Sequence, residues 1–79
     1  MDQRKNIVGK KIRELRIGRG YSQRDLVRES ELLGYPISQN MISRIENGKR
    51  RVTDMELLVF MEVFRVSSAS LLEVAERDQ

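Results

Sequence analysis

The stretch GYPISQNMISRIENGKRR, residues 34–51, decides the fold of this chain. It runs from a Gly-Tyr-Pro turn through a serine and an amphipathic segment to a glycine and a run of basic residues. Ser38 stands where a helix N-cap would stand, and Gly48 stands where a helix would stop. The pattern predicts a short helix over residues 39–47, placed between a turn and a cationic loop.

The start of this helix follows a design that occurs four times in the chain. Each instance has an apolar residue, a Ser or Thr, three further residues and a second apolar residue: YSQRDL (21–26), ISQNMI (37–42), VTDMEL (52–57) and VSSASL (66–71). The hydroxyl is suited to cap a helix, and the apolar pair is suited to form a hydrophobic staple. A single instance would carry little weight, because Ser and Thr near aliphatic residues are common. Four instances at nearly equal spacing predict four helix starts.

A further helix is expected before these starts. Val8, Ile12 and Leu15 fall on one face at the i, i+4, i+7 spacing, and glycines follow as a stop. The five expected helices cover residues 4–17, 23–33, 39–47, 54–64 and 68–76. No sustained alternation of apolar and polar residues predicts a strand. The sequence therefore predicts a compact all-α fold, with residues 1–79 forming a single domain.

The composition excludes several classes of function. The chain of 79 residues has no Cys and no His, which removes disulfides, the usual zinc ligands, the thiolate nucleophile and the commonest general base. We expect no enzyme, no metal site and no cofactor. No apolar run approaches membrane-spanning length, and the N-terminal MDQRKN lacks the apolar core of a secretion signal. A soluble, cytoplasmic protein is expected.

Charge is distributed unevenly along the chain. Residues 1–51 hold thirteen Lys or Arg and six Asp or Glu, whereas residues 52–79 hold two and six. A basic N-terminal part joined to an acidic C-terminal part suggests that one surface faces a polyanion. The alternative is that exposed helix faces are charged with no partner implied.

The helix expected at residues 39–47 has two different faces. Met41, Ile42 and Ile45 share one side, and the opposite side carries uncharged polar groups and a single cation. These outward residues are Gln39, Asn40, Ser43, Arg44 and Asn47. An ordinary solvated face carries Glu and Lys instead. Gln and Asn suit adenine, and Arg suits guanine, in the major groove of DNA. The alternative is a plain polar face near a helix N-terminus.

A cationic loop follows this helix at once. Lys49, Arg50 and Arg51 come directly after the glycine that ends it. Phosphate contacts position a protein on DNA, while base contacts specify sequence. Gln23, at the first position of the preceding helix, adds an amide beside helix N-terminal N–H groups, which form a natural phosphate site. A basic run is often merely solvated, and here its place after the polar face favours phosphate binding.

Four segments together resemble the phage-repressor or Xre-type helix-turn-helix family: VGKKIRELR (8–16), YSQRDL (21–26), ISRIENGKR (42–50) and VSSASLLE (66–73). The resemblance covers residues 7–73. It implies a five-helix, lambda-repressor-like DNA-binding domain whose helix-turn-helix, counted with its capping serines, occupies about residues 22–33 and 38–47. In this family the third helix enters the major groove, usually as part of a dimer on a two-fold operator.

The resemblance also implies roles for individual residues. The base-reading positions fall on Gln39, Asn40, Ser43 and Arg44. The phosphate-binding positions fall on Gln23, Asn47, Lys49 and Arg50. A structural ion pair is implied between Arg16 and Glu46. Between Gln23 and Ile42 this chain has about five more residues than the usual spacing of the family it resembles. We assign the excess to an extra helical turn at 30–33 and to the Tyr35-Pro36 turn.

The leading functional prediction is a sequence-specific DNA-binding transcription regulator, acting as a repressor and associated with the nucleoid. The expected partner is double-stranded DNA, with no membrane and no small-molecule ligand. Residues 54–64 are apolar nearly all round, so the fourth and fifth helices are expected to form a homodimer interface, unless all of this surface is monomer core. The alternative function is a protein-interaction module of the same fold, an antitoxin or adaptor, acting through those two helices.

Overall fold

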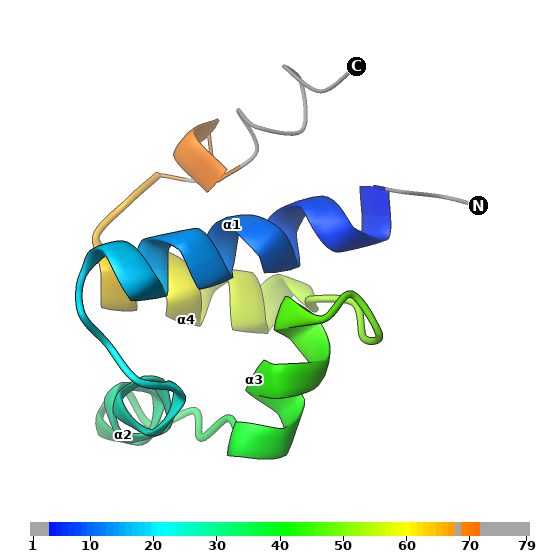
Figure 1. Ribbon diagram of the computed structural model, residues 1–79. Coiled ribbons are helices and arrows are strands. Elements are labelled where there is room, and N and C mark those ends of the chain that lie inside the picture. Colours follow the sequence, from blue (N-terminus) through cyan, green and yellow to red (C-terminus); the bar gives the residue numbers. More distant parts are fainter. Residues whose placement is uncertain (1–3, 68, 72–79) are drawn as a thin grey trace.

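The computed structural model describes residues 4–67 and 69–71. Figure 1 shows its four labelled helices, which are α1 (Arg4–Gly18), α2 (Gln23–Leu32), α3 (Gln39–Glu46) and α4 (Asp54–Phe64). Residues 69–71 are also helical and form the described part of the expected fifth helix; the remainder of that prediction, residue 68 and residues 72–76, lies outside the described residues. The predicted all-α fold is confirmed.

The helix starts are held by the predicted caps. Each of the four expected hydroxyls accepts a hydrogen bond from a first-turn backbone N–H, and these caps are Ser22, Ser38, Thr53 and Ser67. Two of them are complete capping boxes, in which Asp25 and Glu56 accept a bond from the N–H of the cap residue. Local sequence chemistry therefore fixes where these helices begin.

The helix ends differ from the predicted ends by at most one residue. α1 ends one residue later than predicted, α2 and α3 end one residue earlier, and α4 agrees. The last residue predicted for α2 is Leu33, and the last residue predicted for α3 is Asn47. Both are C-caps, which lie half inside a helix. Gly34 and Gly48 follow these caps with φ of 81° and 74°, a conformation that favours glycine.

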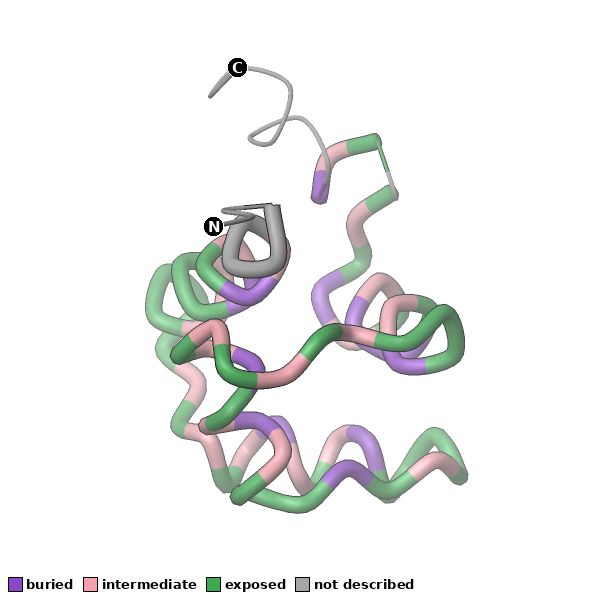
Figure 2. The backbone as a smooth tube through the Cα atoms, turned by 90° about the vertical axis from the view of Figure 1, so that its right-hand side faces the viewer, coloured by how far each residue is buried: buried purple, intermediate pink, exposed green. Residues whose placement is uncertain are grey.

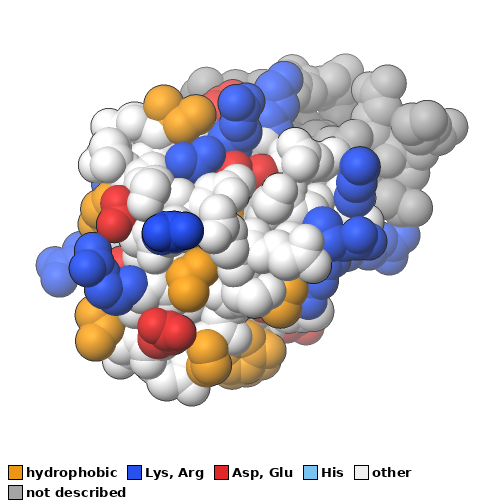
Figure 3. All heavy atoms as spheres, turned by 60° about the horizontal axis from the view of Figure 1, so that its bottom comes forward, with side chains coloured by type: hydrophobic (Ala, Val, Ile, Leu, Met, Phe, Trp, Pro, Cys, Tyr) orange, Lys and Arg blue, Asp and Glu red, His pale blue; other side chains and the backbone are white. Residues whose placement is uncertain are grey.

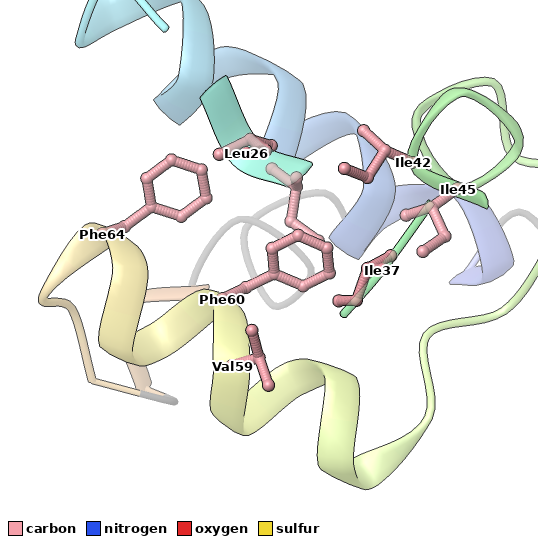
Figure 4. Close-up of a cluster of buried hydrophobic side chains, with 8 residues drawn as sticks. Leu26, Ile37, Ile42, Ile45, Val59, Phe60 and Phe64 are labelled. Atoms are coloured by element: carbon pink, nitrogen blue, oxygen red, sulfur yellow. The ribbon is translucent and has the colours of Figure 1, made fainter. Parts of the chain in front are cut away.

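The core lies where the four helices meet. Figure 4 shows side chains from α2, α3, α4 and the segment before α3 pointing toward one another, namely Leu26, Ile37, Ile42, Ile45, Val59, Phe60 and Phe64. Ile12 of α1 completes this cluster. The buried positions lie on the sides of the helices that face one another (Figure 2). Because burying one large aliphatic side chain contributes roughly 1.5–3 kcal/mol, the two buried isoleucines of α3 determine which of its sides faces solvent.

The lengthened connection between α2 and α3 folds back onto α2. The buried Ser30 donates a hydrogen bond from Oγ to the Val27 carbonyl (2.7 Å) and accepts one from the Ile37 N–H (2.9 Å). The Tyr35 N–H donates to the Ser30 carbonyl (3.1 Å). Ile37 itself is fully buried. The extra residues are therefore tied to the last turns of α2, and they fix the position at which α3 begins.

Candidate nucleic-acid interface

The outer side of α3 is open. Gln39, Asn40 and Arg44 are exposed and Ser43 is half-buried, while Ile42 and Ile45 on the opposite side are fully buried. Within the described residues, Arg44 forms no ion pair and no side-chain hydrogen bond. The four predicted base-reading residues thus share one accessible surface, whose amide, hydroxyl and guanidinium groups are the types that bind base edges in the major groove.

The surface around the outer side of α3 carries basic, acidic and apolar side chains. Figure 3 shows the face that α2 and α3 form, with Lys and Arg side chains spread across it and gathered at its edges, and with fewer Asp and Glu side chains. A hollow of about 450 Å³ lies between α2 and the start of α3, and its lining includes Val27, Ile37, Gln39 and Met41. The hollow adjoins the outer side of α3 and so belongs to the same surface.

A buried ion pair sets the orientation of α3. Arg16 of α1 binds Glu46 through two bonds, Nε to Oε2 (2.8 Å) and Nη2 to Oε1 (3.0 Å). Arg16 also donates to the Tyr21 carbonyl (3.0 Å). The side chain of Glu46 is 2% exposed, and hydrogen bonding to it raises the pKa of Arg16 above the ordinary value, against the effect of burial. Planar, two-point pairing of this kind fixes the relative orientation of the two side chains, in addition to bringing opposite charges together.

Gln23 joins this pair. Its Nε2 donates to Glu46 Oε1 (3.2 Å), and the residue is half-buried at the first position of α2. A phosphate contact was predicted for Gln23. The structure connects its amide to the carboxylate of α3, and the second N–H of that amide remains for another partner. Through Glu46, the three helices α1, α2 and α3 are joined at one point.

A glycine allows α1 to approach α3 closely. A Cβ atom at Gly9 would lie 2.0 Å from the Ile45 carbonyl oxygen. No side chain fits there, because the obstructing atom belongs to the backbone of α3. Sequence reasoning did not assign Gly9 a role. The only local signal is a glycine in the interior of a predicted helix, where alanine would be favoured by roughly 1 kcal/mol if nothing else mattered.

The cationic loop divides its three side chains between two environments. Lys49 and Arg51 are exposed, whereas Arg50 is half-buried. Arg50 binds Glu56 of α4 through Nη1 to Oε1 (2.8 Å) and Nη2 to Oε2 (2.7 Å). Phosphate binding was predicted for Arg50; its guanidinium is instead paired with a buried carboxylate. The sequence does not distinguish the three basic residues, because the distinction depends on the path of the backbone.

The pairing with Arg50 keeps Glu56 ionised in the interior. The Glu56 side chain is 2% exposed. Hydrogen bonding from Arg50 holds the pKa of Glu56 below its ordinary value, although burial alone would raise it. The Thr53 N–H also donates to Glu56 Oε1 (3.0 Å). The sequence predicts the cap at Thr53 but gives no sign that Glu56 also pairs with Arg50.

The turn after α3 uses its backbone donors internally. The N–H groups of Asn47, Gly48 and Lys49 donate to the carbonyls of Ser43 (3.0 Å), Ile45 (3.0 Å) and Arg44 (2.8 Å), respectively. The resemblance implies a phosphate contact for Asn47, whose backbone N–H is already bonded to the Ser43 carbonyl. The structure leaves the exposed side-chain amide as the group that Asn47 can offer, with a long contact of 3.5 Å to Ser43 Oγ.

A comparison with protein families agrees with this geometry. The family model described as helix-turn-helix matches residues 12–71, which is most of the chain. The chain belongs to the helix-turn-helix family. The match confirms the resemblance to the phage-repressor, Xre-like type of this family. It also supports the general part of the functional prediction, that this protein is a DNA-binding regulator. Searches of curated proteins and of solved structures returned no match. Among the described helices, none is both long and apolar enough to cross a membrane.

Proposed function

We propose that this helix-turn-helix protein is a sequence-specific transcription repressor that reads the major groove with the outer side of α3. The observation that carries the proposal is the exposure of Gln39, Asn40 and Arg44 on a helix whose opposite side is fully buried. A rigidly held helix with free polar groups can enter a groove without unfolding. Occupation of promoter DNA would exclude other proteins, which makes repression the simplest outcome.

The proposed base contacts follow from side-chain chemistry. Gln39 and Asn40 offer amides that can pair with adenine at two points, and Arg44 can do the same with guanine O6 and N7. Ser43, one helical turn beyond Gln39, is half-buried and can reach either kind of base. Each two-point contact of this kind discriminates against a wrong base by about 1–3 kcal/mol.

The proposed phosphate contacts surround these bases. Lys49 is exposed directly after the turn that ends α3, and the amides of Gln23 and Asn47 flank the same helix. Phosphate contacts fix register and orientation and carry no sequence information directly. A protein that works in this way acts on the DNA itself, so a cytoplasmic, nucleoid-associated location remains part of the proposal.

We further propose that two copies bind one operator through α4 and the helix whose described part is residues 69–71. Met55 and Leu58 of α4 are 50% and 54% exposed and lie one helical turn apart. Apolar side chains gathered on one exposed face are typical of a surface that another protein covers. The same two residues support the alternative function, in which an antitoxin or adaptor holds a different protein. Sedimentation of Leu58→Glu beside the parent protein, with and without duplex DNA, distinguishes a homodimer from a complex with a different protein.

Selection of bound duplexes from a random pool tests the proposal. We expect a recurring sequence of two half-sites related by two-fold symmetry, because dimeric helix-turn-helix proteins place their half-sites about one helical turn apart. Recovery of a random population would refute sequence-specific reading. Binding should also fall steeply with salt, since phosphate contacts release counterions.

Lys49→Ala tests the phosphate contacts separately. Loss of one phosphate contact should lower affinity for all sequences alike and reduce the slope of log affinity against log salt by about 0.9. The exposed Lys10 of α1 provides a control, because Lys10→Ala removes the same charge from a helix that does not belong to the proposed interface. An equal change in both variants would indicate a general effect of net charge and would contradict a contact at Lys49.

A further inference from the structure

The pair of Arg50 and Glu56 closes the loop between α3 and α4. One end of this loop is fixed where the Lys49 N–H donates to the Arg44 carbonyl (2.8 Å). The other end is fixed where the Thr53 N–H donates to Glu56 Oε1 (3.0 Å). Arg50 fixes the middle, through its two bonds to the carboxylate and a weaker one to the Arg51 carbonyl (3.3 Å). The loop is therefore held at three points.

This arrangement determines which cations the loop presents. The inward turn of Arg50 leaves Lys49 and Arg51, the residues on either side, exposed. A guanidinium that faces a carboxylate at 2.7 Å adds little positive potential outside the pair, because the two charges nearly cancel. The exposed residues Lys49 and Arg51 therefore supply most of the positive electrostatic potential of the loop.

Arg50 cannot reach a phosphate at low cost. To do so it would leave the Glu56 carboxylate, 2% exposed, charged and without its cation. Removal of one partner from a buried ion pair is strongly unfavourable, because the remaining charge stays desolvated. Glu56 would keep only its bonds to the N-terminal turn of α4. A phosphate bond made at that cost would add little to DNA affinity.

We propose that Arg50 and Glu56 are positioning residues for DNA binding, and that Arg51 is the second phosphate-binding cation of the loop, beside Lys49. The proposal rests on the proposed DNA-binding function and assigns the roles within its phosphate contacts. Arg50 acts through the backbone: it holds the loop in the path that carries both neighbouring side chains outward. Neither Arg50 nor Glu56 touches DNA in this arrangement.

The salt dependence of DNA binding separates the two kinds of residue. Affinity for a mixed-sequence duplex is measured over a range of salt concentrations for the parent protein and for Lys49→Gln, Arg51→Gln and Arg50→Met. Each lost phosphate contact reduces the slope of log affinity against log salt by about 0.9. We expect that reduction for Lys49→Gln and Arg51→Gln. We expect Arg50→Met to keep the parent slope while its affinity falls by a similar factor at every salt concentration.

A double variant keeps the test decisive if Arg50→Met folds poorly. Arg50→Met combined with Glu56→Met replaces the ion pair with apolar side chains of similar length, a change that buried pairs often tolerate. We expect it to recover affinity relative to Arg50→Met alone, at the parent slope, because the loop is again held. If Arg50 contacts phosphate, the double variant cannot recover affinity, because it still lacks the cation.

The outcomes distinguish this inference from the function on which it rests. A reduced slope for Arg50→Met together with an unchanged slope for Arg51→Gln would overturn the assignment, while leaving DNA binding in place. A double variant with the reduced slope of a lost contact would overturn it as well. Absence of salt-dependent duplex binding by the parent protein would instead refute the proposed function itself.

Discussion

The two sides of α3 differ in where their partners lie. On the inner side, Ile42, Ile45 and Glu46 meet groups from α1, α2 and α4. On the outer side, Gln39, Asn40 and Arg44 are exposed to solvent. A change on the inner side should therefore alter stability, and a change on the outer side should alter only what the protein binds. The difference shows how one short helix can be held rigidly on one side and still present side chains for binding on the other.

The largest effect on the inner side is expected at Gly9. Gly9→Ala would place a Cβ 2.0 Å from the Ile45 carbonyl oxygen, so α1 and α3 would have to separate. We expect a loss of more than about 4 kcal/mol in the free energy of unfolding, at the extreme of single substitutions. A domain of this size has roughly 4–12 kcal/mol in total, so the variant should be largely unfolded in a urea titration followed by circular dichroism.

Gly18→Ala is the matched control, because it makes the same change in the same helix. No atom lies within 4 Å of the Cβ that it would add. Its stability should be unchanged or higher by up to about 1 kcal/mol, since alanine favours helix over glycine. Equal stability of the two variants would contradict the close approach of α1 and α3.

The next largest effect is expected at Glu46. Glu46→Ala leaves the Arg16 guanidinium, 14% exposed, without its carboxylate, and removes the acceptor of Gln23. Breaking a buried pair of this kind costs about 3 kcal/mol or more, and each kcal/mol lowers the Tm of a small domain by about 4–8 °C. Thermal melting should show the loss. Glu62→Ala, at an exposed position of α4, should melt like the parent; if Glu46→Ala does so too, the pair does not hold α3.

A smaller effect is expected at Ser30. Ser30→Ala removes the hydroxyl that accepts a hydrogen bond from the buried Ile37 N–H, and an unsatisfied buried donor costs about 1–3 kcal/mol. Ser43→Ala makes the same change on α3, where the hydroxyl has only a 3.5 Å contact. Urea titrations should separate the two serines. A smaller loss for Ser30→Ala than for Ser43→Ala would contradict the claim that Ser30 ties down the lengthened connection.

The sequence predicts this fold well because its signals are local. Each helix start depends on a hydroxyl and two apolar residues within six positions, and all four caps form as expected. The outer side of α3 was likewise predictable, since helical periodicity places polar residues opposite Ile42 and Ile45. The Arg16–Glu46 pair joins residues thirty positions apart, and family resemblance indicated it where periodicity could not.

Other features depend on how distant elements meet. Gly9 carries no signal beyond being a glycine inside a helix, because the carbonyl that excludes a side chain belongs to α3. The choice of Arg50 as the inward cation depends on the direction of the loop, and the three adjacent basic residues look alike in sequence. Ser30 is similar: a serine near a helix end predicts nothing until the connection is seen to fold back onto it.

The central claim is that the outer side of α3 reads base identity, and Arg44→Ala tests it most directly. Duplexes selected from a random pool by the parent protein and by Arg44→Ala are compared, and thermal stability is measured in parallel. We expect preference to relax at one base pair in each half-site, at a cost of about 1–3 kcal/mol there, with the free energy of unfolding unchanged within about 0.5 kcal/mol. An unaltered selected sequence, or an affinity that falls equally for every duplex, would contradict it.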